Sequence, residues 1–445
     1  MQVRTDLEAL YPAHVATLRE RLRDALQSIG MRGVLIPSGT PRIAFLDDHT
    51  YPFVVNPHFK AWLPLLDVPE SFLLIREGET PVLLFNQPED YWHKPPADPS
   101  GFWTGEWDIH TVTSLKDVHN LIGDTRELAF IGEETDLAEA WGFSSVNPQA
   151  LIDRLHFDRA FKTPYEIAAL QLANLHAARG HVAAQAAFRR GESEFGIQHA
   201  YLGAMKSREH ETPYSSIIAL NENCAVLHYQ HYETDPPREL RSMLIDAGAD
   251  MNGYAADITR TYASRTGTFA DLVDRMDAEQ RGIISEIEPG MNYAELHKRM
   301  HYRVAQVLRD FALVEMSPQS MVETNLTSAF LPHGLGHLLG LQTHDVGGYQ
   351  QNRKGEMQAP PKDYPALRLT RPIEEGQVFT IEPGIYFIPM LLRELRNAPA
   401  GAAVNWRTVD ELMPFGGIRI EDNVAIQEGV PVNLTRDAFD TVAHE

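Results

Sequence analysis

Between residues 244 and 257 the chain reads Leu244-Ile245-Asp246-Ala247-Gly248-Ala249-Asp250-Met251-Asn252-Gly253-Tyr254-Ala255-Ala256-Asp257. Asn-Gly between two largely apolar runs is the strongest short indication of a β-hairpin, because both residues accept the backbone of a tight two-residue turn. With Asn252 and Gly253 as the turn, Met251 pairs with Tyr254, and this fixes the register of both strands.

The predicted register brings two aspartates to one face of the hairpin. Asp246 faces Thr259, and Asp257 lies two residues away on the same strand face. Such diagonal neighbours have α-carbons ~7–8 Å apart, so their carboxylates can share a cation. An uncompensated carboxylate in an apolar strand is costly. The hairpin therefore predicts a cation site, and the alternative is a pair of edge-strand aspartates in water.

A glycine-rich stretch carries three histidines, His333, His337 and His344, within His333-Gly334-Leu335-Gly336-His337 and His344-Asp345-Val346-Gly347-Gly348. The spacing of the first two is that of a helical zinc motif, but no Glu follows the first His and the glycines disfavour a helix. A glycine-rich turn lets the backbone approach a ligand closely. Any one of these histidines alone could be structural, whereas the cluster indicates a site.

Two glutamates, Glu382 and Glu421, end further strand-like runs, Phe379-Thr380-Ile381-Glu382-Pro383-Gly384 and Gly417-Ile418-Arg419-Ile420-Glu421-Asp422. Alternation along the second run places Arg419 and Glu421 on one face. Taken singly, each glutamate could be a solvated strand residue or half of a surface ion pair. Together with two aspartates and a histidine cluster, they strengthen the prediction of a metal site.

Composition limits the classes of function. The chain has 445 residues, 43% of them hydrophobic, and a formal net charge of −22, and at about 150 residues per domain it fits three domains or two larger ones. The negative charge argues against nucleic-acid and membrane partners. One cysteine, Cys224, excludes an intrachain disulfide. We find no secretory signal in the first 30 residues and no membrane-spanning stretch, and we expect a soluble, cytoplasmic protein.

Two blocks of elements are predicted. The first is an α/β domain that ends near residue 155, with a helix over residues 5–28 that begins near Pro12 and is capped by Gly30. The second opens with Thr163-Pro164-Tyr165-Glu166, a capping box that starts a helix reaching about residue 190. The remaining predicted helices cover residues 194–205, 269–286 and 293–313. The predicted strands cover residues 34–37, 72–75, 82–85 and 128–131 in the first block, with a loop over 91–107, and residues 215–220, 225–229, 243–247, 257–262, 378–381 and 417–420 in the second.

The ordered set Asp246, Asp257, His337, Glu382 and Glu421 resembles the five-ligand dinuclear metal centre of the pita-bread metallopeptidases, which include methionine aminopeptidase, aminopeptidase P and prolidase. The resemblance covers roughly residues 155–430. The first domain is similar to the N-terminal domain of the prolidase and aminopeptidase P branch, which methionine aminopeptidases lack. The resemblance implies a mixed α/β protein with an N-terminal α/β domain of the creatinase and prolidase type over residues 1–158 and a C-terminal α+β pita-bread catalytic domain over residues 159–445.

Two stretches resemble the prolidase branch in particular: residues 367–371, where prolidases place an Arg for the substrate carboxylate, and residues 45–62, similar to bacterial prolidases that also hydrolyse organophosphate esters. The resemblance implies an Xaa-Pro dipeptidase, a homodimer, in which a hydroxide bridging two divalent metal ions attacks the imide bond. Promiscuous organophosphate ester hydrolysis is an expected side activity. Four carboxylates balance two divalent cations, and the donor set favours Mn²⁺, with Zn²⁺ and Co²⁺ as alternatives.

The resemblance also implies roles for catalytic side chains. Glu382 is both a metal ligand and the proton shuttle to the prolyl nitrogen. His228 and His344 match positions that polarise the carbonyl oxygen, and His333 matches a pocket histidine near the proline.

Four further residues are predicted to bind substrate. Arg368 would hold the C-terminal carboxylate and so select dipeptides. Arg419 would either orient Glu421 or contact the substrate carboxylate. Tyr214 matches a pocket residue, and Asp47 would reach the pocket from its own chain or from a partner subunit.

Other readings remain open. An aminopeptidase P would act on longer Xaa-Pro peptides. A non-catalytic pita-bread module and creatinase-type metal-free hydrolysis both conflict with a complete set of five ligands. A thiol hydrolase would use Cys224 and His228, but four strand residues separate them by ~13 Å, so Cys224 is better read as a buried apolar residue.

Overall fold

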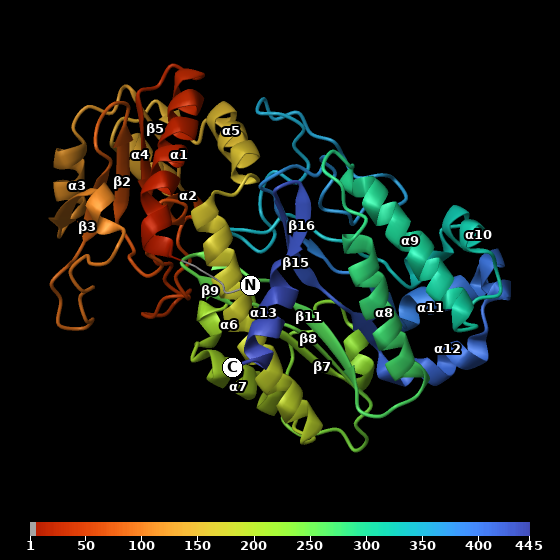
Figure 1. Ribbon diagram of the computed structural model, residues 1–445. Coiled ribbons are helices and arrows are strands. Elements are labelled where there is room, and N and C mark those ends of the chain that lie inside the picture. The colour runs from red at the N-terminus through yellow and green to blue at the C-terminus, as the bar shows by residue number, and fades with distance from the viewer. Residues whose placement is uncertain (1–5) are drawn as a thin grey trace.

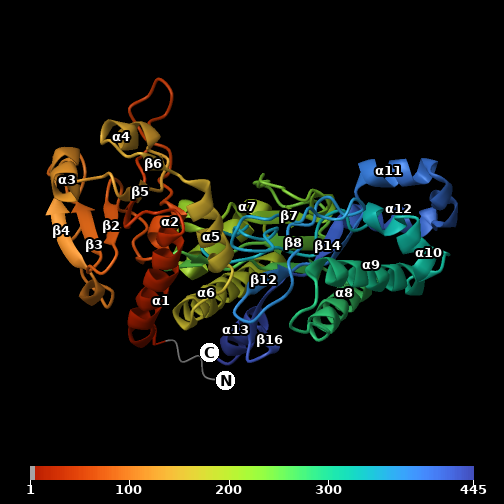
Figure 2. The same ribbon diagram turned by 90° about the horizontal axis from the view of Figure 1, so that it is seen from above.

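A mixed six-stranded sheet forms the centre of the first domain in the computed structural model, which describes residues 6–445. Its strand order is β4-β3-β2-β1-β5-β6, with antiparallel pairs at β1–β2 and β2–β3 and parallel pairs elsewhere. Helices lie on both faces, as Figures 1 and 2 show. The strands are β1 (Gly33–Pro37), β2 (Phe72–Arg76), β3 (Val82–Asn86), β4 (Asp108–Val112), β5 (Leu128–Phe130) and β6 (Ser145–Val146), and the helices are α1 (Leu7–Gln27), α2 (Pro57–Lys60), α3 (Leu115–Ile122), α4 (Thr135–Ala140) and α5 (Gln149–Arg159).

The first helix starts earlier than predicted. Asp6 caps it by accepting a hydrogen bond from the Ala9 amide at 3.2 Å, and Pro12 lies inside it. In the second turn, a proline removes only one backbone bond, and Asp6 supplies a cap, so the helix continues through it. Gly30 has φ +72°, as predicted for the residue after a helix. Residue 5 of the predicted helix lies outside the described residues.

The second domain places long helices on one side of a set of short strands, and Figure 2 shows these helices along one edge. The predicted capping box at Thr163 and Glu166 is present, with both reciprocal hydrogen bonds. The helices are α6 (Pro164–Arg189), α7 (Glu194–Met205), α8 (Thr268–Ile284), α9 (Tyr293–Asp310), α10 (Pro318–Glu323), α11 (Pro389–Asn397), α12 (Trp406–Leu412) and α13 (Leu434–Ala443).

The strands of this domain form two three-stranded sheets, in the orders β11-β8-β7 and β12-β15-β16, and two small ribbons. An isolated bridge between Thr259 of β11 and Glu421, which lies between β14 and β15, links these sheets, and another between Leu338 and Phe379 attaches the histidine-rich segment to β12. The segments that carry the predicted site residues therefore meet where the sheets adjoin. The strands are β7 (Ile217–Leu220), β8 (Ser242–Asp246), β9 (Asp250–Met251), β10 (Tyr254–Ala255), β11 (Thr259–Ala263), β12 (Val378–Ile381), β13 (Gly384–Tyr386), β14 (Gly417–Arg419), β15 (Asp422–Gln427) and β16 (Val430–Asn433).

The hairpin has the predicted register. Asp246 pairs with Thr259 and Met251 pairs with Tyr254, while Asn252 and Gly253 take φ values of 55° and 90°. At its tip, a Cβ on Gly253 would lie 3.1 Å from the Lys60 side chain. The hairpin thus extends from the sheet to the first domain.

One predicted strand is absent. Residues 225–229 do not form a strand, because η3 (Asn221–Ala225), a 3₁₀ helix, and a turn occupy this segment. Asn221 has φ 55°, a left-handed conformation that ends β7. His228 is therefore carried on a loop.

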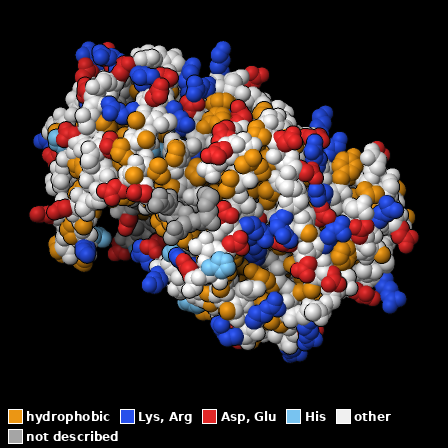
Figure 3. Space-filling model, in the orientation of Figure 1, with side chains coloured by type: hydrophobic (Ala, Val, Ile, Leu, Met, Phe, Trp, Pro, Cys, Tyr) orange, Lys and Arg blue, Asp and Glu red, His pale blue; other side chains and the backbone are white. Residues whose placement is uncertain are grey.

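No helix among residues 6–445 is both long enough and apolar enough to cross a membrane. On the face drawn in Figure 3, acidic and basic side chains are interspersed with apolar ones.

Candidate metal centre

One cavity of about 280 Å³ collects most of the predicted site residues. They come from chain segments up to almost 200 residues apart, which the junction of the sheets brings together. Its lining includes Asp246, Asp257, His337, Glu382, Glu421, His228, His333, His344, Arg368 and Arg419.

Three of these side chains form a compact, buried group. Asp257, His337 and Glu421 can each offer a ligand atom such that all three atoms lie within 4.8 Å of one another. His337 Nδ1 is 3.0 Å from the carbonyl oxygen of Leu338, which can only accept, so Nδ1 carries the proton. His337 Nε2 is then free to bind a cation, 3.4 Å from Asp257 and 3.7 Å from Glu382.

The two hairpin aspartates converge as predicted. The Tyr214 hydroxyl lies 2.8 Å from Asp246 and 2.6 Å from Asp257. Since this hydroxyl has one proton, it can donate to only one of the two carboxylates. Burial, opposed by the charge of Arg419 and reinforced by that of Asp257, raises the pKa of Asp246. Burial opposes the ionisation of Asp257 too, but the neighbouring His337 ring lowers the pKa of that carboxyl. Ionised Asp257 then adds to the negative charge that raises the pKa of Asp246.

The same negative charge acts on the two glutamates. Burial and the charges of Asp257 and Glu382 raise the pKa of Glu421 well above its ordinary value, although Thr259 donates to it at 2.7 Å. Burial also raises the pKa of Glu382 to about 7, against the opposing charges of His337 and Arg419. Four carboxylates that repel one another, beside one imidazole nitrogen, are a donor set that divalent cations fit.

Arg419 is hydrogen-bonded to side chains of the buried cluster and of the strands beside it. It donates to Asp246 at 2.6 Å, to the Tyr386 hydroxyl at 2.9 Å and to Thr259 Oγ1 at 3.1 Å. Among the five predicted metal ligands, Asp246 is the one that Arg419 hydrogen-bonds directly, and its link to Glu421 runs through Thr259 Oγ1. Sequence reasoning missed Thr259 and Tyr386, because neither stands in a motif that suggests a ligand.

The other predicted side chains surround the opening of the cavity. His228, His344 and Arg368 are exposed residues, while His333 accepts from the Tyr386 hydroxyl at 2.8 Å. Burial and the positive charges of His337 and Arg368 lower the pKa of His344 to about 4. His344 is therefore neutral at pH 7 and has an N–H to donate.

A buried charge cluster anchors the segment that carries His344. Asp345 accepts from Arg159 Nε at 2.9 Å and from Lys162 Nζ at 3.1 Å. Burial opposes ionisation, but these two cations hold the pKa of Asp345 at about 2. A Cβ on Gly340 would lie 2.4 Å from Asp345 Oδ2, so glycine is required there. The cluster therefore attaches the connection between α5 and α6 to the segment that carries His344.

Asp47 lies elsewhere. It is on an exposed loop of the first domain, hydrogen-bonded to the Asp48 amide and close to His49, and it does not line the catalytic cavity. Its neighbours Phe45 and Leu46 are 88% and 90% exposed.

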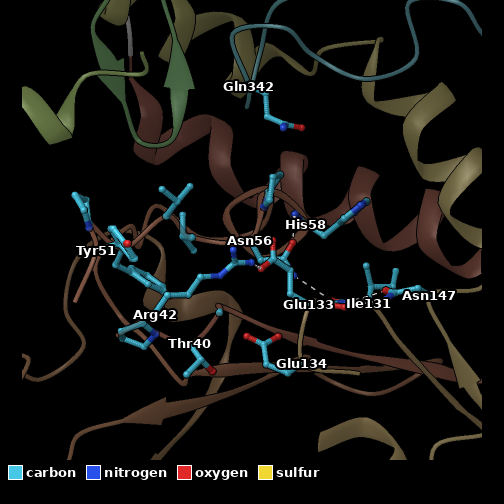
Figure 4. Close-up of a pocket in the computed structure, with 18 of the residues that line it drawn as sticks. Thr40, Arg42, Tyr51, Asn56, His58, Ile131, Glu133, Glu134, Asn147 and Gln342 are labelled. Atoms are coloured by element: carbon cyan, nitrogen blue, oxygen red, sulfur yellow. Dashed lines mark hydrogen bonds and ion pairs between the residues drawn. The ribbon is translucent and has the colours of Figure 1, made fainter. Parts of the chain in front are cut away.

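A larger cavity, of about 580 Å³, lies at the junction of the domains. Figure 4 shows Gln342 of the second domain facing Asn56 and His58 of the first, with Arg42 and Glu133 ion-paired beside them. Its lining includes none of the predicted site residues. The carboxylates and histidines therefore mark the smaller cavity as the candidate site.

Cys224 does not belong to the site. Its side chain is buried and its thiol donates to the Ala219 carbonyl. Burial raises the pKa of this thiol to about 12, so it is no nucleophile at neutral pH. The argument from strand spacing to His228 was wrong, since that segment is not a strand, but the reading of Cys224 as a buried residue is confirmed.

A carboxylate-rich cavity in a domain of this architecture, behind an α/β domain, defines a metallohydrolase of the pita-bread class. Residues 9–157 match the family described as Xaa-Pro dipeptidase, N-terminal domain, and residues 168–428 match metallopeptidase family M24. The chain belongs to this metallopeptidase family and is a metal-dependent hydrolase.

Relatives resemble the chain over almost its whole length. A protein of Pseudoalteromonas haloplanktis named Xaa-Pro dipeptidase is 48% identical over 433 residues, covering 97% of this chain and 98% of the relative. One of Aeromonas hydrophila with the same name is 48% identical over 432 residues, covering 96% and 98%.

Solved structures share the fold. Zinc-substituted Escherichia coli aminopeptidase P in complex with product has a TM-score of 0.70 at 22% identity, covering 94% of this chain and 95% of that chain. The same enzyme with the inhibitor Pro-Leu also has a TM-score of 0.70 at 22% identity, covering 96% and 99%. The predicted mixed α/β fold with a pita-bread domain is thereby confirmed.

Proposed function

We propose that this chain is an Xaa-Pro dipeptidase that hydrolyses dipeptides with a C-terminal proline. The observation that carries the proposal is the 280 Å³ cavity in which a carboxylate cluster, four histidines and Arg368 meet. Full-length relatives of that name at 48% identity support it. We further propose Asp246, Asp257, His337, Glu382 and Glu421 as the ligands of two divalent ions, with Mn²⁺ favoured by the predominance of oxygen donors.

Bound divalent ions would supply Lewis acidity and lower the pKa of water held between the carboxylates. Glu382 would take the proton of the attacking water and return it to the prolyl nitrogen. That nitrogen has no N–H in the substrate and leaves poorly until it is protonated. Without ions, burial raises the pKa of Glu382 to about 7. Bound cations would lower this pKa, so the carboxylate would be ionised and ready to accept the proton of the water.

The residues at the opening would bind and orient the dipeptide. We assign His228 and His344 to the carbonyl oxygen, where an N–H donor stabilises the negative charge that develops. His333 would lie beside the proline. Tyr214 does not line the cavity, so its proposed part is to hold Asp246 and Asp257 through its hydroxyl. Arg368 would pair with the C-terminal carboxylate one residue beyond the cut, so a longer peptide would leave its charge unmatched.

We also propose a cytoplasmic homodimer. The chain has one cysteine, which is buried, and thus needs no oxidising compartment. Exposed apolar side chains beside Asp47, such as Phe45 and Leu46, are typical of an interaction surface. A second copy seated there would bring Asp47 close to a neighbouring site.

Chelation and reconstitution test the function directly. Protein stripped of metal should be inactive on Gly-Pro, and added Mn²⁺ should restore cleavage of the dipeptide but not of a longer Xaa-Pro peptide. Preference for the longer peptide would indicate an aminopeptidase P. Absence of cleavage of both by the metal-loaded protein would contradict the proposed function.

Arg368→Ala tests the carboxylate anchor. It should raise KM for Gly-Pro about tenfold or more, the loss of roughly 1.5–3 kcal/mol from a charge-assisted bond. KM for Gly-Pro amide, which lacks the carboxylate, should change little. Equal effects on both substrates would remove Arg368 from this role.

A further inference from the structure

A buried carboxylate outside the cavity has an unusually complete set of donors. Glu194, the first residue of α7, is 0% exposed. Its Oε1 accepts from the Leu220 amide at 2.8 Å and from Asn223 Nδ2 at 2.9 Å. Its Oε2 accepts from the Tyr229 hydroxyl at 2.7 Å and from the Glu233 amide at 2.9 Å. Four hydrogen bonds replace the water that a buried charge loses.

All four donors belong to one segment of the chain. Leu220 ends β7, Glu233 follows the loop, and Tyr229 is the neighbour of His228. Between the two ends the chain forms a 3₁₀ helix and turns rather than a strand. A loop without a strand ladder must obtain its order from other hydrogen bonds. Glu194 supplies four of them, at both ends and beside the histidine.

We propose that Glu194 is the positioning residue for His228 at the catalytic cavity. Glu194 does not line the cavity, whereas Leu227 and His228 do, and the carboxylate holds the segment that presents them. The inference rests on the proposed function in one respect, the part of His228 in catalysis. The ordering of the loop by Glu194 stands on the contacts alone.

The ordering of the loop requires two acceptor oxygens at Glu194, so a side chain that matches only its volume is not enough. In Glu194→Gln one oxygen becomes an NH₂ group of nearly the same size, which can only donate. Each carboxylate oxygen accepts one backbone N–H, from Leu220 or from Glu233, and a backbone N–H cannot accept. Whichever way the amide is turned, one backbone donor therefore faces another donor. Leaving such a buried group unpaired costs about 1–3 kcal/mol.

Kinetics of Glu194→Gln form the first part of the test. We expect kcat for Gly-Pro to fall at least tenfold and towards the roughly 10²–10³ lost when a donor to a developing oxyanion is removed, with KM and bound metal within twofold of wild type. In a His228→Ala background, Glu194→Gln should cause little further loss. Independent, additive losses would overturn the proposal.

Glu166→Gln is the matched control. Glu166 is another buried glutamate at a helix N-terminus, held by Thr163 and Tyr254, and it does not touch residues 220–233. It should leave kcat near the wild-type value. A loss equal to that of Glu194→Gln would point to general destabilisation and contradict a specific role.

The rate of amide hydrogen exchange in residues 220–233 measures the order of the loop without any substrate. Exchange there should be faster in Glu194→Gln than in wild type and unchanged in Glu166→Gln. Were the wild-type protein inactive on Gly-Pro, the proposed function would fail while this measurement still decided the positioning. Unchanged exchange in a folded Glu194→Gln would overturn the inference.

Tyr229→Phe provides a second variant should Glu194→Gln not fold. It deletes one donor and leaves the carboxylate with three. We expect a smaller fall in kcat with unchanged metal content and faster exchange around His228. Wild-type kcat and exchange in Tyr229→Phe, with Glu194→Gln unfolded, would overturn the proposal.

Discussion

Asp257→Asn should abolish hydrolysis of Gly-Pro. The amide keeps the shape of the side chain but removes one of four negative charges from the buried cluster, so the metal content per chain should fall below two. Loss of several kcal/mol of metal-derived stabilisation corresponds to about a thousandfold or more in rate. Metal analysis and kcat measured on the same preparation provide the check, and full activity with a normal metal content would refute Asp257 as a ligand.

Two controls separate this effect from damage to the hairpin. Asp250→Asn alters a carboxylate of the same hairpin, which accepts from the Gly253 amide at 2.7 Å, and should retain activity. In the metal-free state, Asp257→Asn should change the melting temperature little, because the repulsion that it relieves at Asp246 and Glu421 is offset by the loss of the ion pair with His337. A lower melting temperature of the metal-free variant would show that Asp257 also has a structural role.

Glu382→Gln should lower kcat by roughly 10²–10⁴, the range for removal of a general acid–base group. Glutamine still offers an oxygen to a cation, so the metal content should fall far less than in Asp257→Asn. The expected result is a protein that holds metal and binds Gly-Pro but turns it over slowly.

Glu374→Gln, in the same part of the chain, is the control for this variant. Glu374 is half-exposed and pairs with Arg371, away from the cavity, so kcat should be unchanged. A Glu382→Gln protein that loses its metal completely would show that Glu382 acts chiefly as a ligand, and one with wild-type kcat would exclude it as the proton shuttle.

The parts of the fold that depend on local sequence were predictable. Asn252 and Gly253 accept only a narrow set of turns, so they fixed the hairpin register, and Thr163 with Glu166 marked the start of α6. Strand β4 was missed because its side chains are largely exposed and polar, which leaves no hydrophobic pattern. The predicted start of α1 near Pro12 was wrong, because the free-energy cost of a proline depends on its position in the helix.

The candidate site was predictable to the extent that its residues stand in motifs. Ten such side chains meet in one cavity, while Asp47 lies on an exposed loop. Residues that act through long-range contacts carried no local pattern: Thr259, Tyr386 and Glu194 form hydrogen bonds with partners 26 to 162 positions away in the sequence. The strand predicted over residues 225–229 failed for the same reason, since the segment is organised by Glu194 from another element.

The tip of the hairpin that bears Asp246 and Asp257, where Gly253 lies against the Lys60 side chain, has a thermodynamic consequence. When cations bind the aspartates at one end of the hairpin and the first domain contacts the other end, the free energy of metal binding is coupled to that of domain docking. Whatever metal binding contributes to the docking of the domains, docking must contribute equally to metal affinity, because such coupling is reciprocal. With cations at the proposed ligands, the first domain would act as an effector of the metal centre that is covalently attached and always present.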